Sequence, residues 1–147
     1  MTTSGDEAAA IRALTDNFVK AFNAGNIDAI MRNYIWDESL VVFDVVPRKQ
    51  YLGPDAYRAA WADMFSHLKG NAQMEVADQD ITVDGTVAFG HCFMHVTGTD
   101  TQSQVVNRWV RVTNGYRKIA GNWLIVLEHI SVPVDFSTGK LVPIQRP

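Results

Sequence analysis

Hydrophobic residues in the first half of the chain recur at helical intervals. The first stripe consists of Ile11, Leu14, Phe18, Val19 and Phe22. It predicts a helix over about 6–24, with Ser4 and Glu7 at the spacing of a capping box. A second stripe predicts a shorter helix over 27–34, and a third predicts a helix that begins at Pro54. We therefore expect three helices in the N-terminal half.

After the third stripe the apolar residues alternate with polar ones at period two. The expected strands cover about 72–83, 86–98, 103–118 and 122–132. Short turn signals between them indicate an antiparallel sheet, and a small hairpin over 40–43 and 50–52 precedes them. This order predicts an α+β fold with the helices on one face of a strongly curved sheet. The ending, 133–147, lacks periodicity and is expected to be a surface tail.

Composition narrows the classes of function. A length of 147 residues predicts a single domain over 1–147, and 47% hydrophobic residues suffice for a core. A net charge of −3 argues against nucleic acid as a partner. Cys92 is the single cysteine, so a cytoplasmic protein without disulfides is expected, and neither a signal peptide nor a membrane-spanning segment is recognisable. The four histidines lack metal-ligand spacing, so we expect no metal or other cofactor.

Two segments resemble a known family. Residues 17–30, NFVKAFNAGNIDAI, are similar to the opening of SnoaL-like and ketosteroid-isomerase-like proteins of the nuclear transport factor 2-like superfamily. Residues 116–133, YRKIAGNWLIVLEHISVP, resemble the closing hairpin of that family. The resemblance implies a cone-shaped α+β barrel in which three helices and a curved, mainly antiparallel sheet enclose an apolar pocket. It leaves function open, because the superfamily includes isomerases, cyclases, dehydratases and association modules.

Two opposite charges stand alone in apolar rows of the last long strands. Arg108 shares a strand face with Val106, Val110 and Val112. Glu128 shares a row with Leu124, Val126, Ile130 and Val132, opposite a row that contains His129 and Ser131. Aligned on the family, both charges face the pocket, although a register slip of one residue would reverse every face. An Arg108–Glu128 pair is then expected, either as a structural ion pair or as a catalytic pair that stabilises an oxyanion and relays a proton.

Asp44 is the third catalytic candidate. It ends the first strand near the position where isomerases and cyclases of the superfamily keep a general base. The alignment requires Trp36 to be an insertion and leaves Phe43 directly at the base position, so one residue decides between Phe43 and Asp44. The alternative is a turn aspartate that binds the backbone beside Val45.

Other residues are expected to shape the pocket. In the resemblance, Phe18 falls where the isomerase has its phenolic donor, and Arg108 falls where it has a carboxylic acid. Both differences count against steroid isomerisation. The expected substrate-binding residues are Phe18, Tyr34, Phe43, Tyr57, Trp61 and Met94.

The opposite face of the sheet is also apolar. Its expected outward residues are Phe89, Phe93, Trp109, Trp123, Ile125 and Leu127. A patch of this size predicts a homodimer through the outer face, an arrangement that the superfamily commonly uses. The leading hypothesis is a pocket protein that binds a small, largely apolar carbonyl compound and isomerises, cyclises or dehydrates it by acid–base catalysis. The alternative is a non-catalytic ligand-binding or association module.

Overall fold

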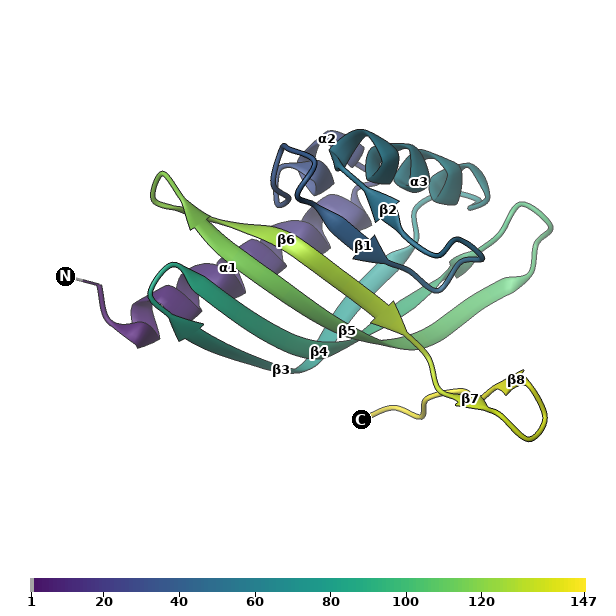
Figure 1. Ribbon diagram of the computed structural model, residues 1–147. Coiled ribbons are helices and arrows are strands. Elements are labelled where there is room, and N and C mark those ends of the chain that lie inside the picture. The colour runs from purple at the N-terminus through teal and green to yellow at the C-terminus, as the bar shows by residue number, and fades with distance from the viewer. Residues whose placement is uncertain (1) are drawn as a thin grey trace.

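The computed structural model describes residues 2–147 (Figure 1). The helices are α1 (Ser4–Asn23), α2 (Ile27–Met31) and α3 (Pro54–Ser66). The strands are β1 (Val41–Phe43), β2 (Tyr51–Leu52), β3 (Gln73–Asp84), β4 (Val87–Thr99), β5 (Val105–Ile119), β6 (Asn122–Ser131), β7 (Val134–Asp135) and β8 (Lys140–Leu141). Within residues 2–147, none of the helices combines the length and apolar character needed to span a bilayer.

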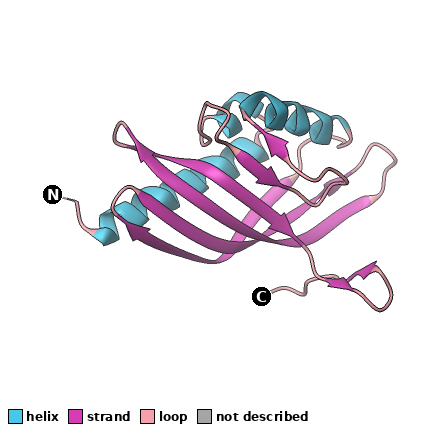
Figure 2. Cartoon of the chain, viewed as in Figure 1, coloured by secondary structure: helices cyan, strands magenta, loops and turns pink. Residues whose placement is uncertain are grey.

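The sheet has six strands in the order β2-β1-β6-β5-β4-β3. Neighbouring strands run antiparallel except β1 and β6, which are parallel. The three helices lie on one face of the sheet, and its long strands curve across them (Figure 2). This arrangement confirms the predicted cone-shaped α+β fold with a mainly antiparallel sheet.

The first helix begins slightly earlier than predicted, and a different pair of residues caps it. Thr3 Oγ1 accepts the amide of Asp6 at 3.2 Å, and Asp6 Oδ2 accepts the amide of Thr3 at 3.0 Å. The capping box is therefore Thr3–Asp6, and the predicted Ser4–Glu7 box is wrong by one residue.

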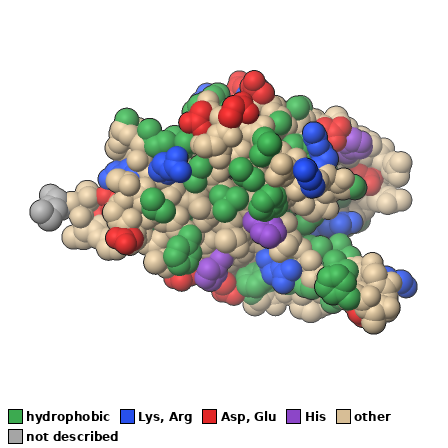
Figure 3. Space-filling model, in the orientation of Figure 1, with side chains coloured by type: hydrophobic (Ala, Val, Ile, Leu, Met, Phe, Trp, Pro, Cys, Tyr) green, Lys and Arg blue, Asp and Glu red, His purple; other side chains and the backbone are tan. Residues whose placement is uncertain are grey.

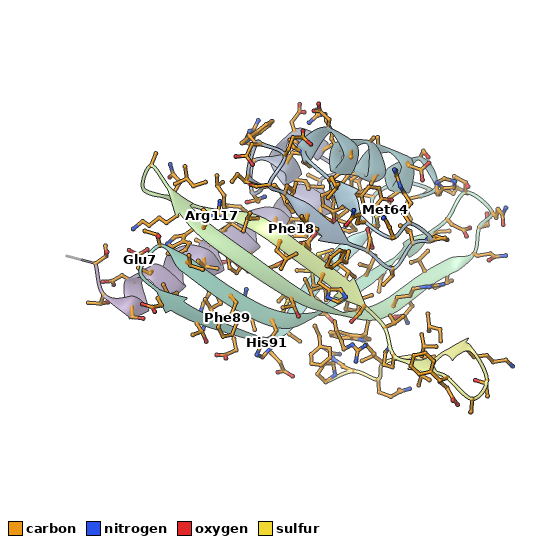
Figure 4. All side chains as sticks on the ribbon, in the orientation of Figure 1. Glu7, Phe18, Met64, Phe89, His91 and Arg117 are labelled. Atoms are coloured by element: carbon orange, nitrogen blue, oxygen red, sulfur yellow. The ribbon has the colours of Figure 1, made fainter. Side chains whose placement is uncertain are left out.

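Glu7 instead joins α1 to the far ends of β5 and β6. Its Oε1 accepts from Lys118 Nζ at 2.7 Å, and its Oε2 accepts from Trp123 Nε1 at 2.5 Å. The hydrogen bond from Lys118 is the largest cause that lowers the pKa of Glu7 to about 2, and Thr2 and Trp123 add to it. Glu7, labelled in Figure 4, thus fixes the first turn of α1 against the sheet.

A β-bulge in β6 reverses the faces that simple alternation predicts. Gly115 pairs with Leu127 but Tyr116 pairs with Ile125, so Val126 is an extra residue. On the C-terminal side of the bulge, Glu128 faces inward as predicted. On the N-terminal side the order is inverted, and the predicted outward residues Trp123 and Ile125 are buried beneath the helices.

Strands β4 and β5 follow the predicted alternation. The inward residues of β4 are Ala88, Gly90, Cys92, Met94 and Val96. They are buried or half-buried, whereas Phe89 and His91 lie on the outer face (Figure 4). Along β5, the row that begins at Val106 and includes Arg108 and Val112 also faces the helices. The register that decides which charges face inward is therefore the one expected from the family alignment.

The C-terminal segment contains a small hairpin rather than an irregular tail. Strands β7 and β8 pair as a separate two-stranded sheet. Asp135 orders the turn between them, because its Oδ1 accepts the amide of Ser137 at 2.9 Å. The hairpin projects from the end of β6 (Figure 1), and Phe136 near its tip is 98% exposed.

Candidate active site

An apolar cavity of about 430 Å³ lies between the helices and the concave face of the sheet. Aromatic, methionine and valine side chains from α1, α3, β3, β4 and β5 form most of its wall, and Phe18 and Met64 mark its helical side in Figure 4. Its acidic and basic lining residues are Asp44, Asp63, His67, Asp100, Arg108 and Glu128. A few polar groups in an apolar hollow are typical of a small-molecule site.

Glu128 is the central polar residue of this cavity. It lies on β6 immediately after the bulge and is only 2% exposed. Tyr34 Oη and Tyr57 Oη donate to its Oε2 at 2.8 and 2.7 Å. When the Asn114 amide is oriented to satisfy both of its ends, its nitrogen donates to Glu128 Oε1 at 3.3 Å. The carboxyl group is thus held by neutral donors from α3, β5 and the segment after α2.

Burial controls the protonation of Glu128. Desolvation raises the pKa of its carboxyl to about 7, against the lowering effect of the Tyr57 and Tyr34 hydrogen bonds, and the nearby Asp44 raises it further. Among residues 2–147, no lysine, arginine or histidine forms an ion pair with Glu128. Glu128 is therefore poised to exchange a proton near neutral pH.

Asp44 supplies a second carboxyl group to the same cavity. Val42 of β1 pairs with Glu128 and Phe43 pairs with His129, so Asp44 follows one step further along the same inner face. Its Oδ1 accepts the amide of Val45 at 2.6 Å. Burial raises the pKa of Asp44, and the Val45 amide opposes that shift. Asp44 therefore makes the expected turn contact and also lines the cavity.

Arg108 faces the cavity but does not pair with Glu128. The structure has no ion pair between these residues in the range 2–147, so the expected Arg108–Glu128 pair is wrong. The reason is their distance along β5: Glu128 is opposite Asn114, whereas Arg108 is opposite Val96 of β4. Arg108 is exposed at the open end of the cavity, and Tyr34 and Tyr57 take its place beside Glu128.

A comparison with known protein families identifies the family of this chain. Residues 11–135 match the SnoaL-like domain. This chain belongs to the SnoaL-like domain family. No curated protein matches it significantly.

Solved structures agree with this SnoaL-like fold. An NTF2-like protein of unknown function from Pseudomonas putida KT2440 is 29% identical, with a TM-score of 0.82 over 96% of this chain and 98% of that chain. A ketosteroid isomerase-like protein from Erwinia carotovora atroseptica SCRI1043 is 21% identical, with a TM-score of 0.72 over 86% and 95% of the two chains. A proposed scytalone dehydratase from Novosphingobium aromaticivorans DSM 12444 is 14% identical, with a TM-score of 0.77 over 87% and 85%. The last two show the fold alone.

Most of the predicted pocket residues lie in or beside the cavity of this SnoaL-like domain. Phe18, Tyr57, Trp61 and Met94 line it, while Tyr34 lies behind Glu128, fully buried. Phe43 is the exception, because β1 turns it to the outer face. There its ring meets His129 edge-on, with 5.5 Å between the centroids. Its expected place in the pocket is wrong, and Asp44 has the inward position instead.

Asn114 is the site residue that sequence reasoning missed. It continues the inward row of β5 two positions after Val112 and is 7% exposed. The expected inward row of β5 ended at Val112. Extending it by two residues would have shown Asn114 as a polar side chain among apolar ones. Cys92 offers no reactive thiol, since burial raises its pKa to about 12. Among residues 2–147, no three histidine, cysteine or acidic side chains are grouped to hold a metal ion.

Proposed function

We propose that this SnoaL-like domain binds a small, largely apolar carbonyl compound and isomerises, cyclises or dehydrates it by acid–base catalysis. The observation that carries the proposal is the presence of two carboxyl groups with raised pKa values, Asp44 and Glu128, in one apolar cavity. Raised pKa values at a concave apolar site are characteristic of groups that transfer protons.

Asp44 is the proposed general base. It lies nearer the end of the inner face than Glu128, and its Oδ1 is already held by the Val45 amide, which leaves Oδ2 for a substrate. An ionised carboxylate in an apolar wall is poorly solvated, so it readily takes a proton from a carbon next to a carbonyl group. The proton can return to another carbon, or it can accompany loss of a hydroxyl group.

Glu128 is the proposed proton donor and relay. With a pKa of about 7, its acid form is well populated at neutral pH and can protonate or hydrogen-bond a carbonyl oxygen as negative charge develops there. When the proton leaves, Tyr34 and Tyr57 remain as donors to the carboxylate. The tyrosines therefore stabilise Glu128 after transfer, and Phe18, Trp61 and Met94 provide the apolar wall that holds the substrate.

Two of the similar structures have names that include the proposed types of reaction. One is named as ketosteroid isomerase-like and another as a proposed scytalone dehydratase. No residue role is transferred from either structure to this chain.

Exchange of a carbon-bound proton tests the proposal without knowledge of the natural substrate. A panel of apolar ketones in D₂O, followed by NMR, should show catalysed deuterium incorporation next to the carbonyl group of at least one member. Asp44→Asn should reduce this rate by about 100-fold or more, since a positioned acid or base typically contributes that much. Asp63→Asn is the matched control, because Asp63 is an exposed carboxylate of the same cavity. If Asp44→Asn and Glu128→Gln both keep the full rate, the catalytic proposal fails.

A non-catalytic ligand-binding module is the second candidate. One observation favours it: both tyrosine hydroxyls are already committed to Glu128, so the cluster is satisfied without a substrate. This candidate predicts that ketones bind, as seen by chemical-shift changes of cavity methyl groups, while no deuterium enters them.

The outer face of the sheet is the proposed homodimer interface. Phe89 is 56% exposed and Leu127 is 38% exposed, and both lie on the side of the sheet away from the helices. Figure 3 shows hydrophobic side chains and histidines interspersed with other residues over the strands in this view. Because Trp123 and Ile125 are buried within the chain, this patch is smaller than the sequence predicted.

A further inference from the structure

Arg108 differs from its neighbours on the inner face of the sheet. The residues two positions away on each side, Val106 and Val110, are aliphatic, as is Val96 opposite it on β4. All four side chains line the cavity. Arg108 itself is exposed, so its guanidinium group lies where the cavity meets solvent.

Within residues 2–147 this guanidinium group has neither an ion pair nor a side-chain hydrogen bond to another residue. Arg111, three positions along the same strand, faces the other way and donates from Nε to Ser131 Oγ at 3.0 Å. The neighbouring strand β6 therefore provides a partner for the arginine on the outer face, whereas Arg108 on the inner face has none among residues 2–147.

Each acidic residue of the same cavity either accepts hydrogen bonds within the protein or is exposed to solvent. Asp100 Oδ1 accepts the amides of Gln102 and Gln104 at 2.9 and 2.8 Å, within its own turn. Asp63 is exposed on the last turns of α3. Asp44 accepts the Val45 amide, and Glu128 is held by its tyrosines. Arg108 is the sole lysine or arginine among the described cavity residues, and it is free to take an anionic ligand group.

We propose that Arg108 forms an anion-binding subsite at the cavity mouth, and that the natural ligand is an amphiphile with an apolar body and a carboxylate or similar anionic group at one end. This inference rests on the proposed function, since it names the substrate class of the same cavity. Arginine suits the role because its planar donors bind a carboxylate in a two-point arrangement.

The strand register sets the length of such a ligand. Asn114, opposite Glu128, is six residues from Arg108 on the same face of β5, which corresponds to roughly 20 Å along an extended strand. Arg108 and Glu128 both line the cavity and the sheet is curved, so the ligand body that joins them is shorter than this separation. Two or three fused or linked rings fit a cavity of about 430 Å³.

A matched pair of fluorescent probes tests the subsite. The probes are 8-anilinonaphthalene-1-sulfonate and its neutral parent, N-phenyl-1-naphthylamine, which share the same apolar body. The intact chain should bind the sulfonate about two- to fivefold more tightly than the neutral probe, as a single charged contact at a solvent-exposed site allows. Arg108→Gln should remove this preference and leave the affinity for the neutral probe unchanged.

Two variants control for location and charge. Arg111→Gln removes an arginine from the outer face of the same strand, so it should leave both affinities unchanged. Val110→Trp fills the cavity and should abolish binding of both probes, provided that its circular dichroism and melting temperature show a folded protein.

Three results would overturn the subsite. They are equal affinities for the two probes in the intact chain, an Arg108→Gln variant that retains the preference, and a preference that survives Val110→Trp. Because neither probe reacts, the outcome is independent of proton exchange at Asp44 and Glu128. If the intact chain shows proton exchange but no anion preference, the subsite alone is discarded. If the intact chain shows the anion preference but no proton exchange, the catalytic proposal alone is discarded.

Discussion

Tyr57 Oη lies 2.7 Å from Glu128 Oε2, although 71 residues separate the two along the chain. The contact joins α3 to β6 at the base of the cavity, and Tyr34 makes a parallel contact from the segment after α2. One buried carboxyl group therefore connects the helical layer to the sheet as well as facing the proposed site.

The buried carboxyl group should make stability fall as the pH rises. Glu128 has a pKa of about 7 in the folded chain and 4.5 as a free side chain, so the folded state binds the proton more tightly. Its contribution is complete below pH 4.5 and is lost as the pH rises to 7, a change on the order of 3 kcal/mol. Urea unfolding across this range should show that slope, and Glu128→Gln should reduce it. An identical slope in both proteins would contradict a buried, protonated Glu128.

Each tyrosine should hold the pKa of Glu128 down. Tyr57→Phe removes a donor to the carboxylate, so the pKa of Glu128 should rise above 7. The free energy of unfolding should fall by about 1–2 kcal/mol, as for loss of a buried hydrogen bond. Carboxyl ¹³C chemical shifts followed against pH would measure the change. Tyr51→Phe is the matched control, because the Tyr51 ring packs on Tyr57 but its hydroxyl is not among the described hydrogen-bond donors to Glu128.

Glu7 should show the opposite pH dependence. Its pKa is lowered to about 2, so its contacts stabilise the fold above pH 4.5 and are lost as the pH falls toward 2. Glu7→Gln should lower the melting temperature at pH 7, and the difference from the parent chain should vanish near pH 2. Lys118→Met removes the strongest partner of Glu7 and should reproduce most of the effect. A melting-temperature difference that is constant with pH would show that the contacts of Glu7 do not depend on its charge.

Deletion of Val126 should damage the fold far more than its truncation. The deletion would remove the bulge and turn Trp123 and Ile125 away from the core. Losing two large buried side chains should cost several kcal/mol, because removing even one typically costs about 3–5 kcal/mol. Val126→Ala keeps the bulge and should lose about 1–2 kcal/mol, as expected for a half-buried valine. Denaturant unfolding of both variants checks the comparison, and equal losses would contradict the role given to the bulge.

The outer face should control self-association if it is the dimer interface. Phe89→Asp places a charge on the exposed outer face of the sheet and should convert a dimer to a monomer in sedimentation-velocity experiments. Phe136→Asp makes the same chemical change on the C-terminal hairpin and should leave the dimer intact. A parent chain that is monomeric at micromolar concentration, or a dimer that resists Phe89→Asp, would refute this interface.

The sequence predicted the architecture because its signals are local and repeated. Helical stripes, period-two strands and short turns each determine a few residues, and the family resemblance determines their arrangement. The family resemblance implied the inward direction of Glu128 and of the row containing Arg108. Alternation then holds along any uninterrupted stretch of strand, so the other residues of each row follow.

The errors arise where a single residue changes the geometry. No composition signal marks Val126 as a bulge, so alternation was continued through it and Trp123 was assigned to the wrong face. The expected Arg108–Glu128 pair was wrong for another reason. Charge complementarity suggested it, but the two residues are far apart along β5, and two tyrosine hydroxyls bind Glu128 instead. Such contacts depend on the packing of α3 against the sheet, which a linear pattern does not contain.

The bulge at Val126 divides one strand into two regions with different mutational constraints. Before it, Trp123 and Ile125 anchor the helical layer, and after it Glu128 and Ile130 face the cavity. Substitutions of Ile130 can therefore alter ligand preference without disturbing the anchor in the first region. A strand interrupted in this way separates positions that hold the scaffold from a position that is open to the ligand.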